Sequence, residues 1–200
     1  MLEDLTFKSL GIVNYYETLE QMRSHINEDE FKNEIWILEH PPVFTLGTAA
    51  DKKHILDSKE IPVIQSDRGG EVTYHGPGQI VIYFLLDIKR LNCGPNKLVA
   101  TIQDFVKELL LKLEIECNFK DGAPGVYVNK RKIASIGLRI SKGKSYHGIS
   151  LNFDMDLSPF KQINPCGYKG LEVTQIKDLN KDISKLELHK MIIDTLRKVF

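Results

Sequence analysis

"GVYVNKRKIASIGLRISKGKSYHGISLNF", residues 125–153, contains three β-rich segments joined by two short polar turns, NKRK and SKGKS. Each segment is rich in Val, Ile, Tyr or Phe, which favour the pleated, half-buried surface of a sheet. Short polar connections between such segments are typical of hairpins. This stretch therefore predicts an antiparallel meander in the second half of the chain.

Further strands are predicted outward from this meander: a short one near the amino terminus, then residues 34–40, 61–67 and 78–88. Helices are predicted from a cap at Asn14 to residue 26, over residues 96–117, and from a Ser184/Glu187 capping box to the end. Strands outnumber helices, and the helices neither alternate strictly with strands nor gather at one end. The pattern favours an α+β domain with a mixed β-sheet and flanking helices, spanning residues 1–200 as a single unit.

The composition excludes several classes of protein. Lys plus Arg and Asp plus Glu number 27 each, so no basic excess indicates a nucleic-acid partner. The longest apolar run, residues 80–86, is far shorter than the roughly 20 residues needed to span a bilayer. The three cysteines form no C-x-x-C pair, which argues against a disulfide framework and a structural metal. With no secretory signal at the amino terminus, we expect a cytoplasmic, reducing location and no membrane partner.

The densest set of functional side chains lies in "SDRGGEVTYHGPGQ", residues 66–79, between two predicted strands. Glycine lets a backbone approach a ligand closely, so this loop has the composition of a site wall, although a wide hairpin connection is an equally good interpretation. It matches neither G-x-G-x-x-G nor a Walker loop and so indicates no nucleotide phosphate. Of the other histidines, His40 and His147 are expected to be structural residues at strand ends, and the remainder at the surface: His25, His54 and His189.

The cysteines differ in context. Cys117 follows an apolar helical stripe and is expected to serve packing. Cys93 and Cys166 lie in turns, where an incidental thiol is the simplest interpretation, so context alone does not make either a nucleophile. Lys132 begins a β-rich segment with an apolar continuation, and a lysine drawn partly toward a core can lose its proton more easily than a solvated one.

Five motifs together resemble the bacterial lipoyl(octanoyl) transferases, a branch of the biotin/lipoate protein ligase superfamily. They are EHPPVFTLG (39–47), RGGEVTYHGPGQIVIY (68–83), KIASIGLRI (132–140), YHGISLNF (146–153) and LSPFKQINPCGYKG (157–170). Their order and spacing follow the family. The resemblance implies the catalytic-domain fold of the superfamily and the activity of an octanoyl-[acyl-carrier-protein]:protein N-octanoyltransferase in lipoate biosynthesis.

The resemblance also implies the site. Cys166 would carry the octanoyl group as a thioester and Lys132 would be its partner, with neither a cofactor nor a metal required. The acyl group would lie against three segments, which comprise Arg68, Gly69, Gly70, Glu71, Val72, Thr73, Tyr74 and His75, then Ser135, Ile136 and Gly137, and finally Gly148, Ile149 and Ser150. The implied partners are octanoyl-acyl carrier protein, the lipoyl domains of 2-oxo acid dehydrogenase complexes and the glycine cleavage H protein, with the enzyme a monomer.

Two other functions remain open on the sequence alone. An ATP-dependent lipoate or biotin protein ligase would share the fold, but those ligases carry a longer glycine run ending in His-Asp, and here Gly76 stands in place of the acid. A non-catalytic module could bind acyl carrier or lipoyl domains without turnover, although it would have no need of Cys166 and Lys132. A cysteine protease is set aside because no signature with a histidine base surrounds Cys166.

Overall fold

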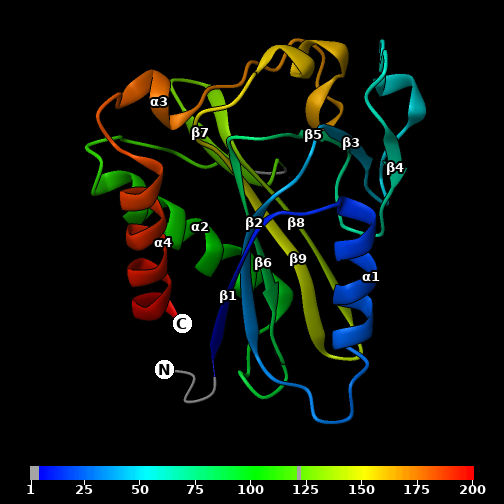
Figure 1. Cartoon of the computed structure of the whole chain (residues 1–200), viewed down its shortest axis with the longest axis vertical. Helices are drawn as coiled ribbons and strands as arrows, with labels where there is room; N and C mark the ends of the chain where they lie inside the picture. The colour runs from blue at the N-terminus through cyan, green and yellow to red at the C-terminus, as the bar shows by residue number, and fades with distance from the viewer. Residues whose placement is uncertain (1–4, 121–122) are drawn as a thin grey trace.

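A twisted mixed sheet runs through the centre of the molecule (Figure 1). The computed structural model describes residues 5–120 and 123–200, except for the side chain of Cys166. Within these residues the sheet has six strands in the order β1-β2-β6-β9-β8-β7. Only β1 and β2 pair in parallel; the other neighbours are antiparallel. The strands are β1 Thr6–Ile12, β2 Glu34–Glu39, β6 Gln79–Leu85, β7 Gly125–Val128, β8 Arg131–Ser141 and β9 Lys144–Asn152.

The predicted meander is confirmed as β7, β8 and β9. Its two turns take left-handed backbone conformations, at Asn129 and Lys130 and again at Lys142 and Gly143. Positive φ at both central residues defines the tight turns whose twist matches that of the flanking strands. The register places Ser135 opposite Ser150 and Gly137 opposite Gly148, which proves important for the site.

Helices cover both faces of the sheet, which confirms the predicted α+β class (Figure 1). Helices α2 (Pro95–Leu111) and α4 (Lys185–Val199) lie on one side and α1 (Tyr15–His25) lies on the other, while the short α3 (Ile176–Leu179) precedes α4. The expected caps are present: the Asn14 side chain accepts from two backbone N–H groups of α1, and Ser184 and Glu187 form a reciprocal capping box.

Helix α2 is shorter than the sequence predicted. It ends at Leu111 instead of residue 117, because Glu114 adopts a positive φ of 59° that breaks the helical path. Leu113 and Ile115 remain buried in the same core from the following loop, so the apolar pattern continues beyond the helix. Cys117, half-buried against that core, has its thiol pKa raised by burial.

A smaller sheet stands beside the main one and has the order β4-β3-β5 within the described residues. Its strands are β3 Val43–Leu46, β4 Val63–Gln65 and β5 Val72–His75. Strand β4 is shorter than the predicted 61–67. Three 3₁₀ turns lie at the same end of the molecule: η1 Lys52–His54, η2 Ser158–Gln162 and η3 Pro165–Gly167. Among the described residues, no helix has the length and apolar character that crossing a membrane requires.

The main core between the sheet and helices α2 and α4 should dominate stability. Ile102 of α2 is fully buried there, so Ile102→Ala is expected to lower the free energy of unfolding by about 3 kcal/mol through lost burial and a cavity. Lys107→Ala, on the exposed side of the same helix, is the matched control and should change it by less than about 0.5 kcal/mol. Urea unfolding followed by circular dichroism measures both; equal losses would contradict this account of the core.

Candidate active site

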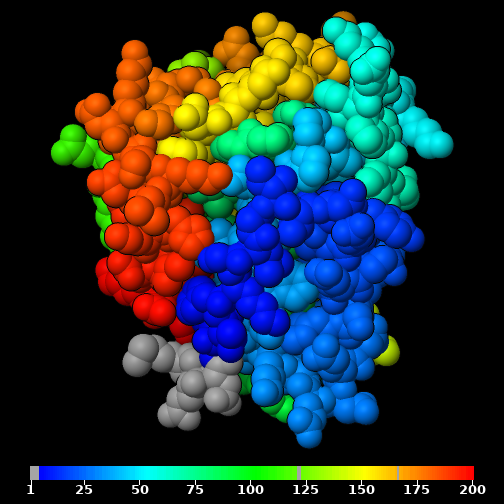
Figure 2. All heavy atoms as spheres, in the orientation of Figure 1, coloured from blue at the N-terminus to red at the C-terminus, as the bar shows by residue number. Residues whose placement is uncertain are grey.

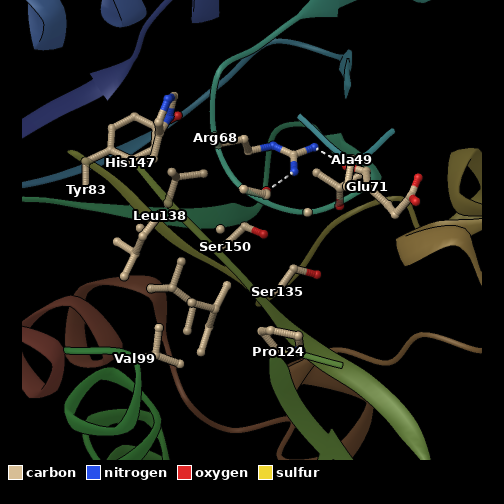
Figure 3. A pocket seen from close by; sticks show the side chains of 18 of the residues that line it. Ala49, Arg68, Glu71, Tyr83, Val99, Pro124, Ser135, Leu138, His147 and Ser150 are labelled. Carbon is tan, nitrogen blue, oxygen red and sulfur yellow. Dashed lines mark hydrogen bonds between the residues drawn. The ribbon is translucent and has the colours of Figure 1, made fainter. Parts of the chain in front are cut away.

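Arg68 holds the glycine-rich loop in shape from inside. Its buried guanidinium donates to the Thr45 carbonyl and hydroxyl at 2.7 and 2.9 Å, to the Gly69 carbonyl at 2.9 Å and to the Glu71 carbonyl at 2.7 Å. The loop therefore curls around its own arginine, and Figure 3 shows two of these bonds. Because backbone carbonyls converge on a permanent cation, the loop has one strongly favoured conformation.

The loop also packs directly on the main sheet. The Gly69 N–H donates to the Leu138 carbonyl of β8 at 2.9 Å. A Cβ on Gly137 would come within 2.9 Å of the Gly69 carbonyl, so a larger residue there would push the loop away. Close approach of two backbones is the condition that requires glycine at this position.

A pocket of about 530 Å³ lies between this loop and the sheet. Figure 3 shows Glu71, Ala49, Ser135 and Pro124 at one end and Val99, Leu138, Tyr83 and His147 toward the other. Ala49, Pro124 and Tyr168 are exposed, so the pocket opens to solvent at the first end. The small residues paired across β8 and β9 leave the room for it, namely Ser135, Gly137, Gly148 and Ser150.

Two predicted residues flank the open end. Cys166 lies in the turn η3, two residues before the pocket-lining Tyr168 and next to Gly167, where a Cβ would contact the Glu71 side chain at 3.3 Å. The Cys166 side chain lies outside the described part of the structure. Lys132 of β8 is only 2% exposed, and its Nζ donates to the Pro124 carbonyl at 3.0 Å and lies 5.6 Å from the Tyr127 ring centre. The lysine ammonium is thus held by a carbonyl and an aromatic ring at the edge of the pocket.

Buried histidines surround the other end. The pKa of His40 is lowered to about 4, chiefly by burial, and burial likewise lowers the pKa of His75 well below its usual value. His40 is hydrogen-bonded through both ring nitrogens, to the Val13 carbonyl at 2.7 Å and the Tyr83 hydroxyl at 2.8 Å. The expectation that His40 is structural is confirmed, and both rings are neutral near pH 7.

His147 differs from its prediction. It lies inside β9 and lines the pocket, with φ of 59° and no partner for Nδ1 among the described residues. Its Nε2 is 2.8 Å from Asp67, whose other oxygen accepts from Tyr146 and Arg23. Burial raises the pKa of Asp67, but these hydrogen bonds outweigh that effect and hold it well below its usual value. The cluster ties the start of the glycine-rich loop to β9 and α1.

Most of the predicted binding residues meet at this pocket. All the residues proposed from the three segments line it, except Tyr74. The Tyr74 ring turns into the core of the smaller sheet, where it packs on Phe44 and Phe160, because alternate residues of β5 face opposite sides. Lys132 is not a lining residue but touches Pro124, which is one.

Sequence reasoning missed several lining residues. Tyr83 could have been found, because it falls in a quoted motif and the register pairs it with Gly148. Tyr15 and Val99 carry no comparable signal, since each belongs to a helix whose apolar pattern only indicates burial. The surface prediction for His25 is wrong: it is 7% exposed, and its Nε2 bonds the Lys32 carbonyl.

Comparison with known proteins identifies the family. The profile of the lipoyl protein ligase A/B catalytic domain matches residues 14–197. The chain therefore belongs to this family. Curated relatives named octanoyltransferase include those of Shewanella halifaxensis, 52% identical with 96% of this chain and 89% of the relative covered, and Shewanella piezotolerans, 50% identical with 96% and 88% covered. The Pseudomonas entomophila octanoyltransferase is 51% identical over 88% of this chain and 82% of its own. The resemblance seen in the motifs is confirmed.

Solved structures agree on the fold. The bi-partite lipoate protein ligase of Thermoplasma acidophilum superposes with a TM-score of 0.75 at 14% identity, covering 100% of this chain and 84% of that one. Lipoate-protein ligase A bound with ATP gives 0.72 at 14% identity, with 100% and 85% covered. The biotin protein ligase of Aquifex aeolicus gives 0.56 at 17% identity, with 99% and 70% covered. The predicted ligase-type catalytic fold is thereby confirmed.

The neutral buried histidines predict a pH dependence of stability. His40 has a lower pKa when folded than when unfolded, so the unfolded chain binds more protons and stability falls as pH falls below about 6.5. From about pH 7.5 to about pH 5, His40 alone should cost about 2 kcal/mol of unfolding free energy. Urea titrations at both pH values test this, and His40→Asn should show a shallower fall. A wild-type stability that rises toward pH 5 would contradict the assignment.

Proposed function

We propose that this chain is an octanoyltransferase of lipoate biosynthesis, which moves an octanoyl or lipoyl group from acyl carrier protein to a lysine of a lipoyl domain through a thioester on Cys166. The pocket is the observation that carries the proposal. It is largely apolar, and it opens close to the buried Lys132 of β8 and to the turn η3, which contains Cys166. The relatives of about 50% identity named octanoyltransferase support the same activity.

In the first half-reaction, the Cys166 thiolate attacks the carbonyl carbon of the octanoyl thioester. The C–S bond to the carrier breaks, a C–S bond to Cys166 forms, and the carrier leaves as a thiolate that is proposed to take its proton from the Lys132 ammonium, which leaves Lys132 neutral. A free thiol has a pKa near roughly 8.5, and a nearby cation favours the thiolate. Lys132 is proposed as that cation, since its ammonium is held at the pocket edge by Pro124 and Tyr127.

In the second half-reaction, the amine of the acceptor lysine attacks the Cys166 thioester. The C–N amide bond forms as the C–S bond breaks, Cys166 leaves as a thiolate, and the amine loses a proton. Lys132, neutral at that stage, is proposed to accept this proton. The acyl group passes from one thioester to another and then to an amide, and the last step is favourable in free energy. The thioester bond of the donor therefore supplies the activation.

The octanoyl chain is proposed to occupy the pocket against Ser135, Gly137, Gly148 and Ser150. The glycine-rich wall would cover it from the other side, and burial contributes about 0.8 kcal/mol for each methylene. Tyr74 is not proposed as a contact, given its place in the neighbouring core. The Gly69 N–H is already donated to Leu138, so oxyanion donors must be sought elsewhere in this wall.

The proposed partners are octanoyl-acyl carrier protein as donor and, as acceptors, the lipoyl domains of 2-oxo acid dehydrogenase complexes and the glycine cleavage H protein. A cytoplasmic monomer is proposed with them. The structural neighbour from Thermoplasma acidophilum is described together with its E2 lipoyl domain, which supports an acceptor of that kind for this fold.

Cys166→Ala should abolish transfer, because it removes the atom that forms the thioester. After incubation with octanoyl-acyl carrier protein, intact-mass spectrometry should show one octanoyl increment on the wild type and none on Cys166→Ala. Adding an apo lipoyl domain should move the increment to the domain. Cys93→Ser is the matched control and should retain the adduct. Modification of the domain only with ATP and free octanoate would instead establish a ligase, and full transfer by Cys166→Ala would refute the mechanism.

Lys132→Met should move the alkylation of Cys166 by iodoacetamide to higher pH by about one unit, because the variant keeps most of the buried stem but removes the charge. Peptide mass spectrometry assigns the label to Cys166 and separates it from the other thiols. Lys132→Arg, which keeps the charge, should shift the profile less. Identical pH profiles for the wild type and Lys132→Met would show that Lys132 has another role.

A further inference from the structure

A second hollow, of about 970 Å³, lies beside the turn that contains Cys166. It is lined mainly by residues of the segment 156–173, together with Leu56 and Arg131. In Figure 2 this loop forms the gold and orange spheres at the top of the molecule, next to the cyan spheres of the segment that contains Leu56. The backbone bonds between Leu56 and Gln162 and between Asn164 and His54 fasten the two segments together.

The segment around Cys166 contributes residues to both this hollow and the pocket proposed for the acyl chain. Asn164 and Pro165 line the hollow, Tyr168 lines the pocket, and Lys169 and Gly170 line the hollow again. Position 166 thus falls where the chain crosses from one cavity to the other. A thioester has two arms at its reacting carbon, an acyl chain and a thiol-bearing group, and a nucleophile that stands between two cavities can receive one arm in each.

The lining of the hollow differs from that of the acyl pocket. Its interior contains apolar side chains, among them Leu157, Phe160 and Val173. Its rim carries the cations Arg131, Lys161 and Lys169, and none of the three forms an ion pair with any residue that the structure describes. Two carboxylates, Asp156 and Glu172, also line it, so three cations stand against two anions and the lining has a net charge of +1.

We infer that this hollow binds the phosphopantetheine arm of the acyl carrier protein, with the phosphate on Lys161, Lys169 and Arg131. The inference rests on the proposed function and adds the docking site of the donor. The arm has a thiol at one end, amides and a gem-dimethyl group along its length, and a phosphate at the other end. The apolar interior fits the gem-dimethyl part, the cationic rim fits the phosphate, and the thiol end reaches the segment that contains Cys166.

Two small donors that differ only in the phosphate isolate this contact: octanoyl-pantetheine and octanoyl-4′-phosphopantetheine. The rate of octanoyl-enzyme formation is measured for each by intact mass, as a second-order constant. The wild type should react with the phosphorylated donor about tenfold faster, the value of one charge-assisted hydrogen bond. In the double variant Lys161→Gln/Lys169→Gln this preference should fall to about twofold or less.

Two control variants distinguish loss of the lysine charges from a general disturbance of the structure. Lys161→Arg/Lys169→Arg keeps both charges and should keep the preference, as should Lys190→Gln on the exposed side of α4. Lys161 and Lys169 are exposed, so the double Gln variant should fold, and its unfolding midpoint checks this. The assignment would be overturned if the double Gln variant lost rate equally with both donors, or if it lost rate only in the transfer to the lipoyl domain.

The two levels of proposal fail differently. If octanoyl-pantetheine acylates the wild type but the phosphate gives no preference, the arm does not dock in this hollow while the octanoyltransferase function stands. If neither donor nor octanoyl-acyl carrier protein acylates Cys166, the proposed function fails and this inference fails with it.

Discussion

The buried guanidinium of Arg68 is the interaction on which the site depends. Burying a cation is costly unless its donors are satisfied, and here the carbonyls of Thr45, Gly69 and Glu71 accept from it. Those carbonyls belong to β3 and to the loop itself, so the same contacts that satisfy the charge also fix the loop. A loop with this glycine content would otherwise have many conformations, and the arginine stabilises the one in which the loop covers the pocket.

The pocket arises from side chains that the sheet lacks. Where β8 and β9 pair, Gly137 faces Gly148 and Ser135 faces Ser150. A Cβ on Gly148 would clash with the Ile82 carbonyl, so the neighbouring backbone also requires glycine at this position. The glycine-rich loop lies so close to the sheet that the Gly69 N–H donates to the Leu138 carbonyl of β8. The same few positions therefore provide both the space for a ligand and the close packing of the glycine-rich loop on the sheet, and larger side chains there would remove both.

The sequence was most informative where a local rule decides the structure. The two polar turns of the meander, the Asn14 cap and the Ser184/Glu187 box follow from residue chemistry, and each was predicted; the left-handed conformation of the turns is seen only in the structure. The end of α2 was misplaced because Leu113 and Ile115 satisfy burial from a loop as well as from a helix. Family motifs located most of the pocket wall, whereas Tyr15 and Val99 reach it only through tertiary packing. His25 shows the same limit, since its polar neighbours in sequence do not reveal that it folds against Phe31 and Trp36.

A series of hydrogen bonds, each with a defined donor and acceptor, links Arg68 of the glycine-rich loop to the backbone of Lys132. Arg68 can only donate, so the Thr45 hydroxyl accepts from it at 3.1 Å and turns its own hydrogen toward His75 Nε2, 3.4 Å away. The neutral His75 then donates through Nδ1 to the Gln79 oxygen at 2.7 Å.

The amide of Gln79 is oriented by that bond and donates to Asn152 at 2.9 Å, and Asn152 donates to the Thr174 carbonyl at 3.0 Å. The Thr174 N–H in turn bonds the Lys132 carbonyl at 3.0 Å. The donor and acceptor roles of the side chains from Thr45 to Asn152 are each set by the bond before, beginning with a cation that cannot be deprotonated, whereas the backbone groups of Thr174 and Lys132 have fixed roles. Protonation of His75 would place a second donor against Thr45 and reverse that link, which gives the burial that keeps His75 neutral a structural purpose. The glycine-rich loop and the backbone of Lys132 are therefore joined by one continuous series of hydrogen bonds through the smaller sheet, β6 and β9.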